Sequence, residues 1–225
     1  MAILEKVVLE DIYVGGECNL FHHGLVRDCL SNRSFEFYQG CLYGIIGEFG
    51  NGGAALSCGI TGNTNFYGGK IFIDNKEVSI QHLNKNSWYI GNDRTNINKT
   101  KLLKRKAKIN KDTIKDQIIK GINDSNFNLG YEEIKKLFKI SDERVERNIR
   151  YISGERWKAS AAIGYANRKK IFCYPWLNTK DMELWYDQIK HTVNVLLKSG
   201  CIVIIPTTKK ENIEGISSQI YIEFV

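Results

Sequence analysis

The amino-acid sequence predicts an α/β protein with a mixed or parallel sheet, an N-terminal antiparallel β-subdomain and a helical insert. Three observations support this prediction. Strand and turn patterns fill residues 1–94. Between residues 95 and 150, Lys, Asn, Glu, Ile and Leu recur with helical spacing. From residue 151 onward, strand and helix patterns alternate with short connections, which favours a right-handed parallel sheet.

The N-terminal region is expected to contain several strands and one short helix. Residues 41–47 form a continuous apolar run that ends in glycine, a pattern typical of a buried strand. A glycine-rich loop follows, and residues 54–60 are the helix candidate. The other strand candidates are residues 3–9, 34–37, 70–74 and 87–90, with turns at 39–40, 63–69 and 75–76.

The rest of the chain is expected to add four helices and three strands. The helices are residues 113–119, 131–139, 157–167 and 181–198, and the strands are 170–174, 201–205 and 219–225. In the second helix, Ile134, Leu137 and Phe138 share one face. A length of 225 residues suits a single domain. We expect its core in 1–94 and 151–225 and a helical subdomain in 95–150.

Composition excludes several classes of protein. Hydrophobic residues make up 43% of the chain, which is far above the level of a disordered protein. No apolar run approaches the about 18 residues needed to span a bilayer, and the N-terminus lacks the apolar stretch of a secretory signal. We therefore expect a cytoplasmic protein that reaches a membrane only through a partner.

The cysteines and the basic residues point to no ligand. The six cysteines form no C-x-x-C motif and have no histidine at zinc-ligand spacing. We expect reduced thiols and no metal site. Seven of the Lys and Arg residues lie between Lys99 and Lys111, and they equal the whole net charge of +7. This basic strip has no aromatic residue for base stacking. It favours a solvated or docking surface, next an anionic lipid or acidic partner, over nucleic acid.

The loop after the apolar run has the glycine frame of a phosphate-binding loop. Such a loop reads G-x-x-x-x-G-K-[ST] between a strand and a helix, because glycines let backbone N–H groups converge on phosphate. The lysine reaches the outer phosphates and the hydroxyl binds Mg²⁺. This chain keeps the frame but replaces both side chains, so the expected loop residues are Gly47, Gly50, Asn51, Gly52, Gly53, Ala54 and Ala55. Gly53 stands at the lysine position and Ala54 at the hydroxyl position. On its own, such a turn is more often a tight strand-to-helix connection than a nucleotide site.

Six segments in order resemble the motifs of an ABC-transporter nucleotide-binding subunit over nearly the whole chain. They are residues 33–62, 67–78, 88–93, 150–156, 170–177 and 199–208. The first resembles the strand, Walker A loop and helix of a P-loop-type core, and the second resembles the hairpin that follows. Asn92 stands where the family's Q-loop has glutamine. Ser153, Gly154 and Glu155 resemble the signature motif with one glycine missing.

The departures from the family pattern fall on the chemistry. Pro175 replaces the Walker B aspartate, and Trp176 replaces the glutamate that polarises the attacking water. The switch histidine position falls on Pro206 or Thr207, and the D-loop pattern is absent near Asp181. The resemblance also offers Tyr13, or its rival Phe21, as an adenine-stacking aromatic, although each could be packing or surface.

The resemblance implies a subunit without hydrolysis of its own. Losing one electrostatic stabiliser of a transition state costs on the order of 10²–10³ in rate, and five such groups are missing. We expect weak or absent Mg-ATP binding and no cofactor, with ATP held only at an interface shared with a partner. Ser153 and Gly154 could complete that partner's site, or Ser153 could simply cap a helix whose first-turn charge is Glu155.

Three functions follow from this pattern. The first is a degenerate subunit that pairs with an ATPase-type subunit, in a homo- or heterodimer, and docks to a transmembrane protein through the groove between core and insert. The second is a soluble regulator or scaffold on an ABC-like fold. The third is a divergent active ATPase that uses Lys70 or Lys76 in place of the lost lysine, which ranks lowest because no acid replaces Pro175 and Trp176.

Overall fold

The computed structural model describes residues 4–20, 24–91 and 112–224. The chain divides into two compact units, one formed by Met1–Tyr89 with Lys170–Val225 and the other by Ile90–Lys169. The second unit begins earlier and ends later than the expected helical subdomain of residues 95–150. The first unit holds both sheets, and the second unit is helical.

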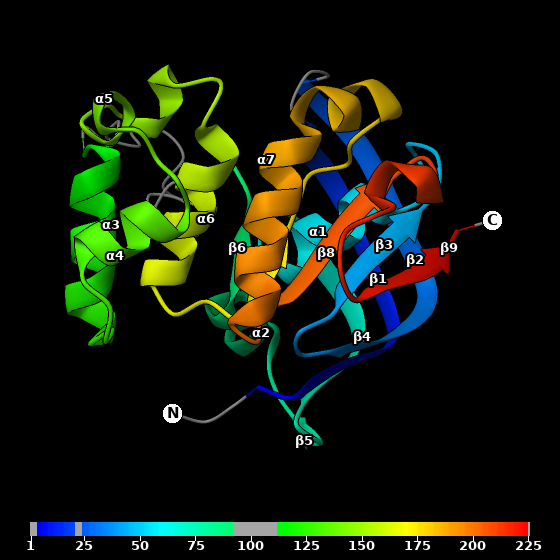
Figure 1. Ribbon diagram of the computed structural model, residues 1–225. Coiled ribbons are helices and arrows are strands. Elements are labelled where there is room, and N and C mark those ends of the chain that lie inside the picture. Colours follow the sequence, from blue (N-terminus) through cyan, green and yellow to red (C-terminus); the bar gives the residue numbers. More distant parts are fainter. Residues whose placement is uncertain (1–3, 21–23, 92–111, 225) are drawn as a thin grey trace. The chain divides into compact units, whose positions relative to one another are not determined.

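The antiparallel sheet of the first unit is built on a long hairpin. Strands β1 (Lys6–Leu20) and β2 (Gly24–Tyr38) pair along their length, and β4 (Asn65–Ile73) and β5 (Lys76–Glu77) extend the sheet in the order β2-β1-β4-β5 (Figure 1). Register shifts interrupt the β1–β2 pairing near Ile12. Asp74 and Asn75, with φ of 49° and 64°, form the two-residue turn between β4 and β5, which Asn and Asp tolerate well.

The second sheet is parallel, as the sequence predicts. Its order is β6 (Ser87–Tyr89), β7 (Ile171–Cys173), β8 (Ile202–Thr207), β3 (Leu42–Ile46) and β9 (Gln219–Glu223). All four pairings run parallel. The order places β8 at the centre, with β3 between β8 and the edge strand β9. Every residue of β8 is buried, which fits its apolar sequence.

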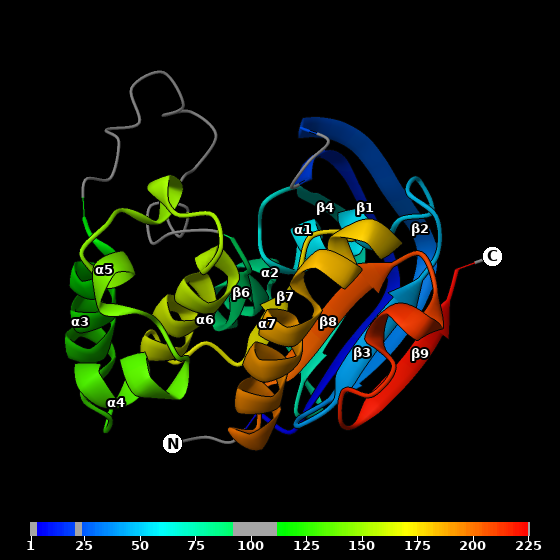
Figure 2. The ribbon, with the colours of Figure 1, turned by 45° about the horizontal axis from the view of Figure 1, so that its top comes forward.

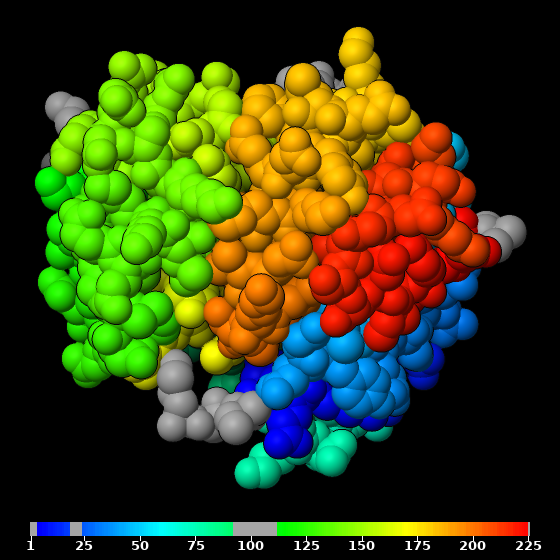
Figure 3. Space-filling model, in the orientation of Figure 1, coloured from blue at the N-terminus to red at the C-terminus, as the bar shows by residue number. Residues whose placement is uncertain are grey.

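Helices cover the parallel sheet. The eight residues of α1 (Gly53–Ile60) are all buried, because this helix contacts β1 and β2 of one sheet and β8 of the other. The long helix α7 (Thr179–Lys198) packs on β8 and begins at an N-cap asparagine, Asn178 (Figures 1 and 2). At the surface, α7 lies beside the C-terminal segment that carries β9 (Figure 3).

Short elements escaped the sequence prediction. Helix α2 (Ile80–Asn86) has only seven residues and begins at Ser79, whose hydroxyl accepts a hydrogen bond from the His82 N–H at 3.3 Å. The 3₁₀ helix η4 (Lys210–Ile213) has four residues. Elements of two turns or fewer present too few residues for a helical period to be recognised.

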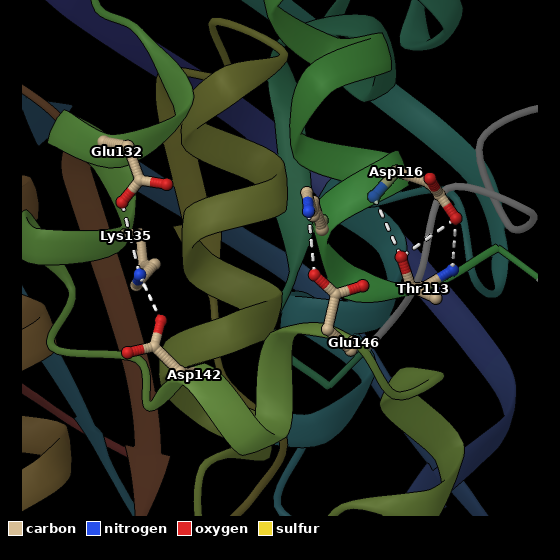
Figure 4. A network of polar contacts seen from close by, with 7 residues as sticks. Thr113, Asp116, Glu132, Lys135, Asp142 and Glu146 are labelled. Carbon is tan, nitrogen blue, oxygen red and sulfur yellow. Dashed lines mark hydrogen bonds and ion pairs between the residues drawn. The ribbon is translucent and has the colours of Figure 1, made fainter.

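The second unit contains α3 (Ile114–Ser125), α4 (Tyr131–Leu137), α5 (Asp142–Val145), the 3₁₀ helix η3 (Ile149–Tyr151) and α6 (Arg156–Ala166). A capping box starts α3: the Asp116 N–H donates to Thr113 Oγ1 at 3.1 Å, and the Thr113 N–H donates to Asp116 Oδ2 at 2.9 Å (Figure 4). Lys135 pairs with both Glu132 and Asp142, which ties α4 to α5. The alanine-rich α6, expected in the core, belongs to this unit.

Several sequence features lie outside the described residues, namely the basic strip between Lys99 and Lys111, Asn92 and Phe21. No helix in the described ranges has the length and hydropathy to cross a membrane. All six cysteines are free thiols. Burial raises the pKa of Cys201 to about 12 and raises that of Cys173 further, which leaves both unreactive at neutral pH.

Candidate phosphate-binding loop

The glycine loop connects a central strand to a buried helix. It leaves β3 at Ile46 and enters α1 at Gly53, with Gly52 as the N-cap. Gly50 and Gly52 have φ of 100° and 99°, values that side chains other than glycine rarely adopt. A Cβ at Gly52 would lie 2.9 Å from the Cys29 carbonyl oxygen of β2. The glycine frame therefore serves both the turn and the close approach of β2.

The residues that the sequence analysis matched to the family's lysine and hydroxyl are apolar and buried. Gly53, Ala54 and Ala55 are all buried in the first turn of α1. A Cβ at Gly53 would lie 3.0 Å from the Cβ of Pro206, on the neighbouring strand β8. The loop therefore offers no cation, and the space that a lysine side chain would enter begins against a proline ring.

A buried acid that the sequence analysis did not single out meets the loop from β2. Asp28 is 3% exposed. Its Oδ1 accepts hydrogen bonds from the Gly52 N–H and from the adjacent Cys29 N–H, both at 3.0 Å. Its Oδ2 accepts the Ala55 N–H at 2.9 Å. Figure 1 shows the two elements involved, β2 and α1. The signal in the sequence is its position: Asp28 and Leu30 share the inward face of β2. A carboxylate on that face needs donors.

The Walker B-like segment fills the space beside the loop with rings. Residues 174–177, which follow β7, are all buried. Trp176 donates from Nε1 to the Gly47 carbonyl oxygen at 3.1 Å. Its ring lies edge-on to Phe49, with centroids 5.6 Å apart and an interplanar angle of 73°. An indole therefore packs on the loop at the residue that the sequence analysis matched to the family's glutamate, and Pro175 offers no side-chain ligand.

The switch-like position is fully used within the fold. Thr207 is buried at the end of β8. Its hydroxyl donates to the Leu177 carbonyl oxygen at 2.7 Å and accepts from Asn212 Nδ2 at 2.7 Å. Its carbonyl oxygen accepts the Gly47 N–H at 3.0 Å. These bonds hold β8 to the loop and leave the hydroxyl no free direction toward a phosphate.

The C-terminal segment closes the loop on another side. Phe224 donates its N–H to the Ile46 carbonyl oxygen at 2.7 Å. Its own carbonyl oxygen accepts from Asn51 Nδ2 at 3.3 Å. A Cβ at Gly47 would lie 3.1 Å from the Phe224 Cβ. The strand that follows β8 in the chain therefore rests directly against the start of the loop.

The signature-like turn lies at the start of α6. Ser153 is exposed, and a Cβ at Gly154 would meet no atom within 4 Å. Glu155 is the N-cap, so the alternative in which Ser153 caps the helix and Glu155 stands in its first turn is wrong. The Glu155 carboxylate instead accepts the Ser141 N–H at 3.0 Å and the Ser141 hydroxyl at 3.2 Å. The glutamate thus anchors α5, while Ser153 and Gly154 stay open.

Other candidate residues lie away from the loop. Ile12 and Val14 of β1 are buried, and Val14 packs against Gly59 of α1. Tyr13, between them and 44% exposed, therefore projects from the opposite face of the strand. Lys76 is in β5, at the opposite edge of the antiparallel sheet from β2. Asp181 lies in the first turn of α7, where its N–H donates to Asn178 Oδ1 at 2.8 Å.

The described residues contain no group of three or more His, Cys, Asp or Glu side chains arranged to hold a metal ion. The loop supplies backbone N–H groups and carries one acid of its own, Glu48. The acid that the N–H groups of Gly52 and Ala55 bind is Asp28 of β2. The N–H groups of the turn can therefore bind an anion, and in this structure they bind the Asp28 carboxylate.

The parallel sheet, the strand–loop–helix at its centre, the added antiparallel sheet and the helical unit together define a P-loop-type core of the ATP-binding cassette class. The sequence profile of the ABC transporter family matches residues 30–174, and the chain belongs to that family. No curated protein matches the chain.

Solved structures show the same fold. An ABC transporter ATP-binding protein from Pyrococcus furiosus is 13% identical, with 96% of each chain covered and a TM-score of 0.61. The cassette MJ0796, described as bacterial and dimeric, is 16% identical over 96% of this chain and 94% of its own, with a TM-score of 0.59. The cbiO1 subunit from Clostridium perfringens is 17% identical over 94% and 81%, with a TM-score of 0.58.

Proposed function

We propose that this chain is a catalytically degenerate nucleotide-binding subunit of an ABC transporter. It would hydrolyse no ATP at its own loop, pair with a subunit that does, and dock to a transmembrane protein from the cytoplasmic side. The observation that carries the proposal is that Gly53, Trp176 and Thr207 are each packed or hydrogen-bonded inside the fold. In the sequence, Gly53 matches the family's lysine, Trp176 its glutamate, and Pro206 or Thr207 its histidine.

The number of lost groups argues against slow catalysis. Each electrostatic stabiliser contributes on the order of 10²–10³ in rate, and effects within one site are far from additive. Even so, residues 47–55 contain no lysine or arginine to neutralise a γ-phosphate, and Pro175 and Trp176 provide no carboxylate. Lys76, one of the two residues suggested as replacements, lies at the distant edge of the antiparallel sheet.

A role in pairing is supported by the signature-like turn at Ser153 and Gly154. In the family, each ATP lies between one subunit's Walker A loop and the other's signature motif. Here the signature-like turn keeps an exposed Ser153 and an unobstructed Gly154, with the N–H groups of α6 just beyond. The structure of MJ0796 is described as dimeric and cbiO1 as part of a transporter complex, which supports an assembly of this kind.

The proposal is tested by purification and turnover. The tagged chain is expressed in the organism that encodes it and purified in detergent, and the proteins that copurify with it are identified by mass spectrometry. We expect a transmembrane protein together with an ATPase subunit that has intact motifs. The isolated chain should show no Mg-ATP turnover above a buffer control.

Two outcomes would contradict the proposal. ATP turnover that copurifies with the wild-type chain through several columns would show an active enzyme. Recovery of a soluble partner alone, without a membrane protein, would favour the regulator or scaffold instead. A Gly154→Trp variant, which blocks the turn, should lower turnover of the reconstituted complex while the partner's own fold stays intact.

A further inference from the structure

We propose that the Asp28 carboxylate takes the place of a phosphate group in the glycine loop, and that it is the residue that excludes phosphate from this chain. The inference deepens the proposed function and shares its premise that the loop holds no nucleotide. It adds a single residue as the cause of exclusion, and that residue precedes the first segment that resembles a family motif, residues 33–62.

The geometry of the contact is that of a bound anion. In a phosphate-binding loop, N–H groups of the turn and of the first helical turn point at an oxyanion, and the helix dipole favours its charge. Here the N–H groups of Gly52, the N-cap, and Ala55, in the first turn of α1, donate to the two oxygens of one carboxylate at 3.0 and 2.9 Å. The Cys29 N–H adds a third bond at 3.0 Å.

The contact is fixed by the fold on both sides. Asp28 lies within the continuous pairing of β1 and β2, opposite Gly16, so its backbone cannot retreat without breaking the sheet. Gly52 lies directly against β2, since a Cβ there would be 2.9 Å from the Cys29 carbonyl oxygen. Asp28 is 3% exposed, and three N–H groups donate to its carboxylate, so the side chain is held between the strand and the loop.

The carboxylate and a phosphate exclude each other. The same two N–H groups cannot donate linearly to both, and two anions a few ångströms apart repel strongly where water is excluded. No lysine in the loop offsets that repulsion, because its position is Gly53. Restoring the lysine alone would therefore leave the site occupied, whereas removing the carboxylate would free the N–H groups.

The test uses inorganic phosphate on the full-length chain. Asp28→Ala removes the carboxylate, and Asp28→Asn keeps the shape but removes the charge. Glu36→Gln is the matched control, since Glu36 is an exposed acid of the same strand that pairs with Lys6. Phosphate, with sodium chloride at equal ionic strength as reference, is titrated while the amide resonances of Gly52 and Ala55 and the melting temperature are followed.

We expect the wild-type chain and Glu36→Gln to show no saturable response. Asp28→Ala should bind phosphate at least tenfold more tightly than the wild type, with shifts at Gly52 and Ala55, and Asp28→Asn should lie between them. If Asp28→Ala unfolds in plain buffer, phosphate should restore its folded circular dichroism spectrum where chloride does not.

The inference is overturned if phosphate shifts the wild-type Gly52 and Ala55 amides with saturation, or if both Asp28 variants ignore phosphate, folded or not. These results are separate from the test of function. A wild type without turnover whose Asp28 variants ignore phosphate refutes only the role of Asp28, whereas turnover at the wild-type loop refutes the proposed function.

Discussion

Replacing Trp176 by the family's glutamate should destabilise the protein without producing an ATPase. Trp176 is 7% exposed, packs on Phe49 and donates to the Gly47 carbonyl oxygen. Removing a buried aromatic ring costs about 3–5 kcal/mol. The new carboxylate would also leave the Gly47 carbonyl oxygen without its donor, because both groups are hydrogen-bond acceptors. We expect the free energy of unfolding to fall by about 3–5 kcal/mol.

Urea unfolding followed by circular dichroism measures this loss, and a phosphate-release assay measures turnover. For a chain of this size, each kcal/mol shifts the melting temperature by about 2–4 °C. Trp176→Phe is the control, because it keeps a six-membered ring against Phe49 and introduces no charge. It loses the N–H donor and the smaller ring of the indole, so it should cost less than Trp176→Glu. A Trp176→Glu protein as stable as the wild type, or one that hydrolyses Mg-ATP, would refute the reasoning.

Three further predictions test other parts of the structure. Gly53→Ala should lower the free energy of unfolding by about 1–3 kcal/mol through overpacking, whereas Gly154→Ala, with open space around it, should stay within about 0.5 kcal/mol; equal effects in urea unfolding would contradict the packing described. Hydrogen bonds from the Thr113 N–H and hydroxyl lower the Asp116 pKa below 3.8, so their stabilisation is present above that pH and is lost as pH falls through the folded-state pKa. Thr113→Ala keeps the N–H bond and removes the hydroxyl bond, so it should lose slightly less stability than the wild type between neutral pH and that acid range. An acid profile identical to that of the wild type would refute the contribution of the hydroxyl bond. Burial raises the Cys201 pKa to about 12, so mass spectrometry should find Cys201 unmodified by iodoacetamide at pH 8 until urea unfolds the chain; labelling of the folded protein would show that the strand opens.

The elements of the fold that depend on short stretches of sequence could be predicted. The apolar run at 41–47 became β3, and the glycine frame became the turn between β3 and α1. Departures of Pro175 and Trp176 from the family pattern were visible because a motif is read position by position. The parallel order of the second sheet followed from alternating strands and helices.

The features that the sequence did not predict depend on contacts between residues far apart in the chain. Asp28 is 24 residues from Gly52, and no local pattern links a β2 acid to a loop N–H. Its inward position on β2 was the available signal, but the strand was predicted only from residue 34 and so did not include it. Likewise, the alternation of strands and helices cannot show which compact unit a buried helix such as α6 joins.

The contact between Gly53 and Pro206 has an evolutionary consequence. A mutation that restores the lysine first meets a proline, and one that restores the glutamate first loses a ring that supports Gly47. Each of these two substitutions is therefore unfavourable by itself until the residues that it contacts have also changed. Under the proposed function, this mutual dependence would make a return to ATP hydrolysis slower than change at the surfaces that contact a partner.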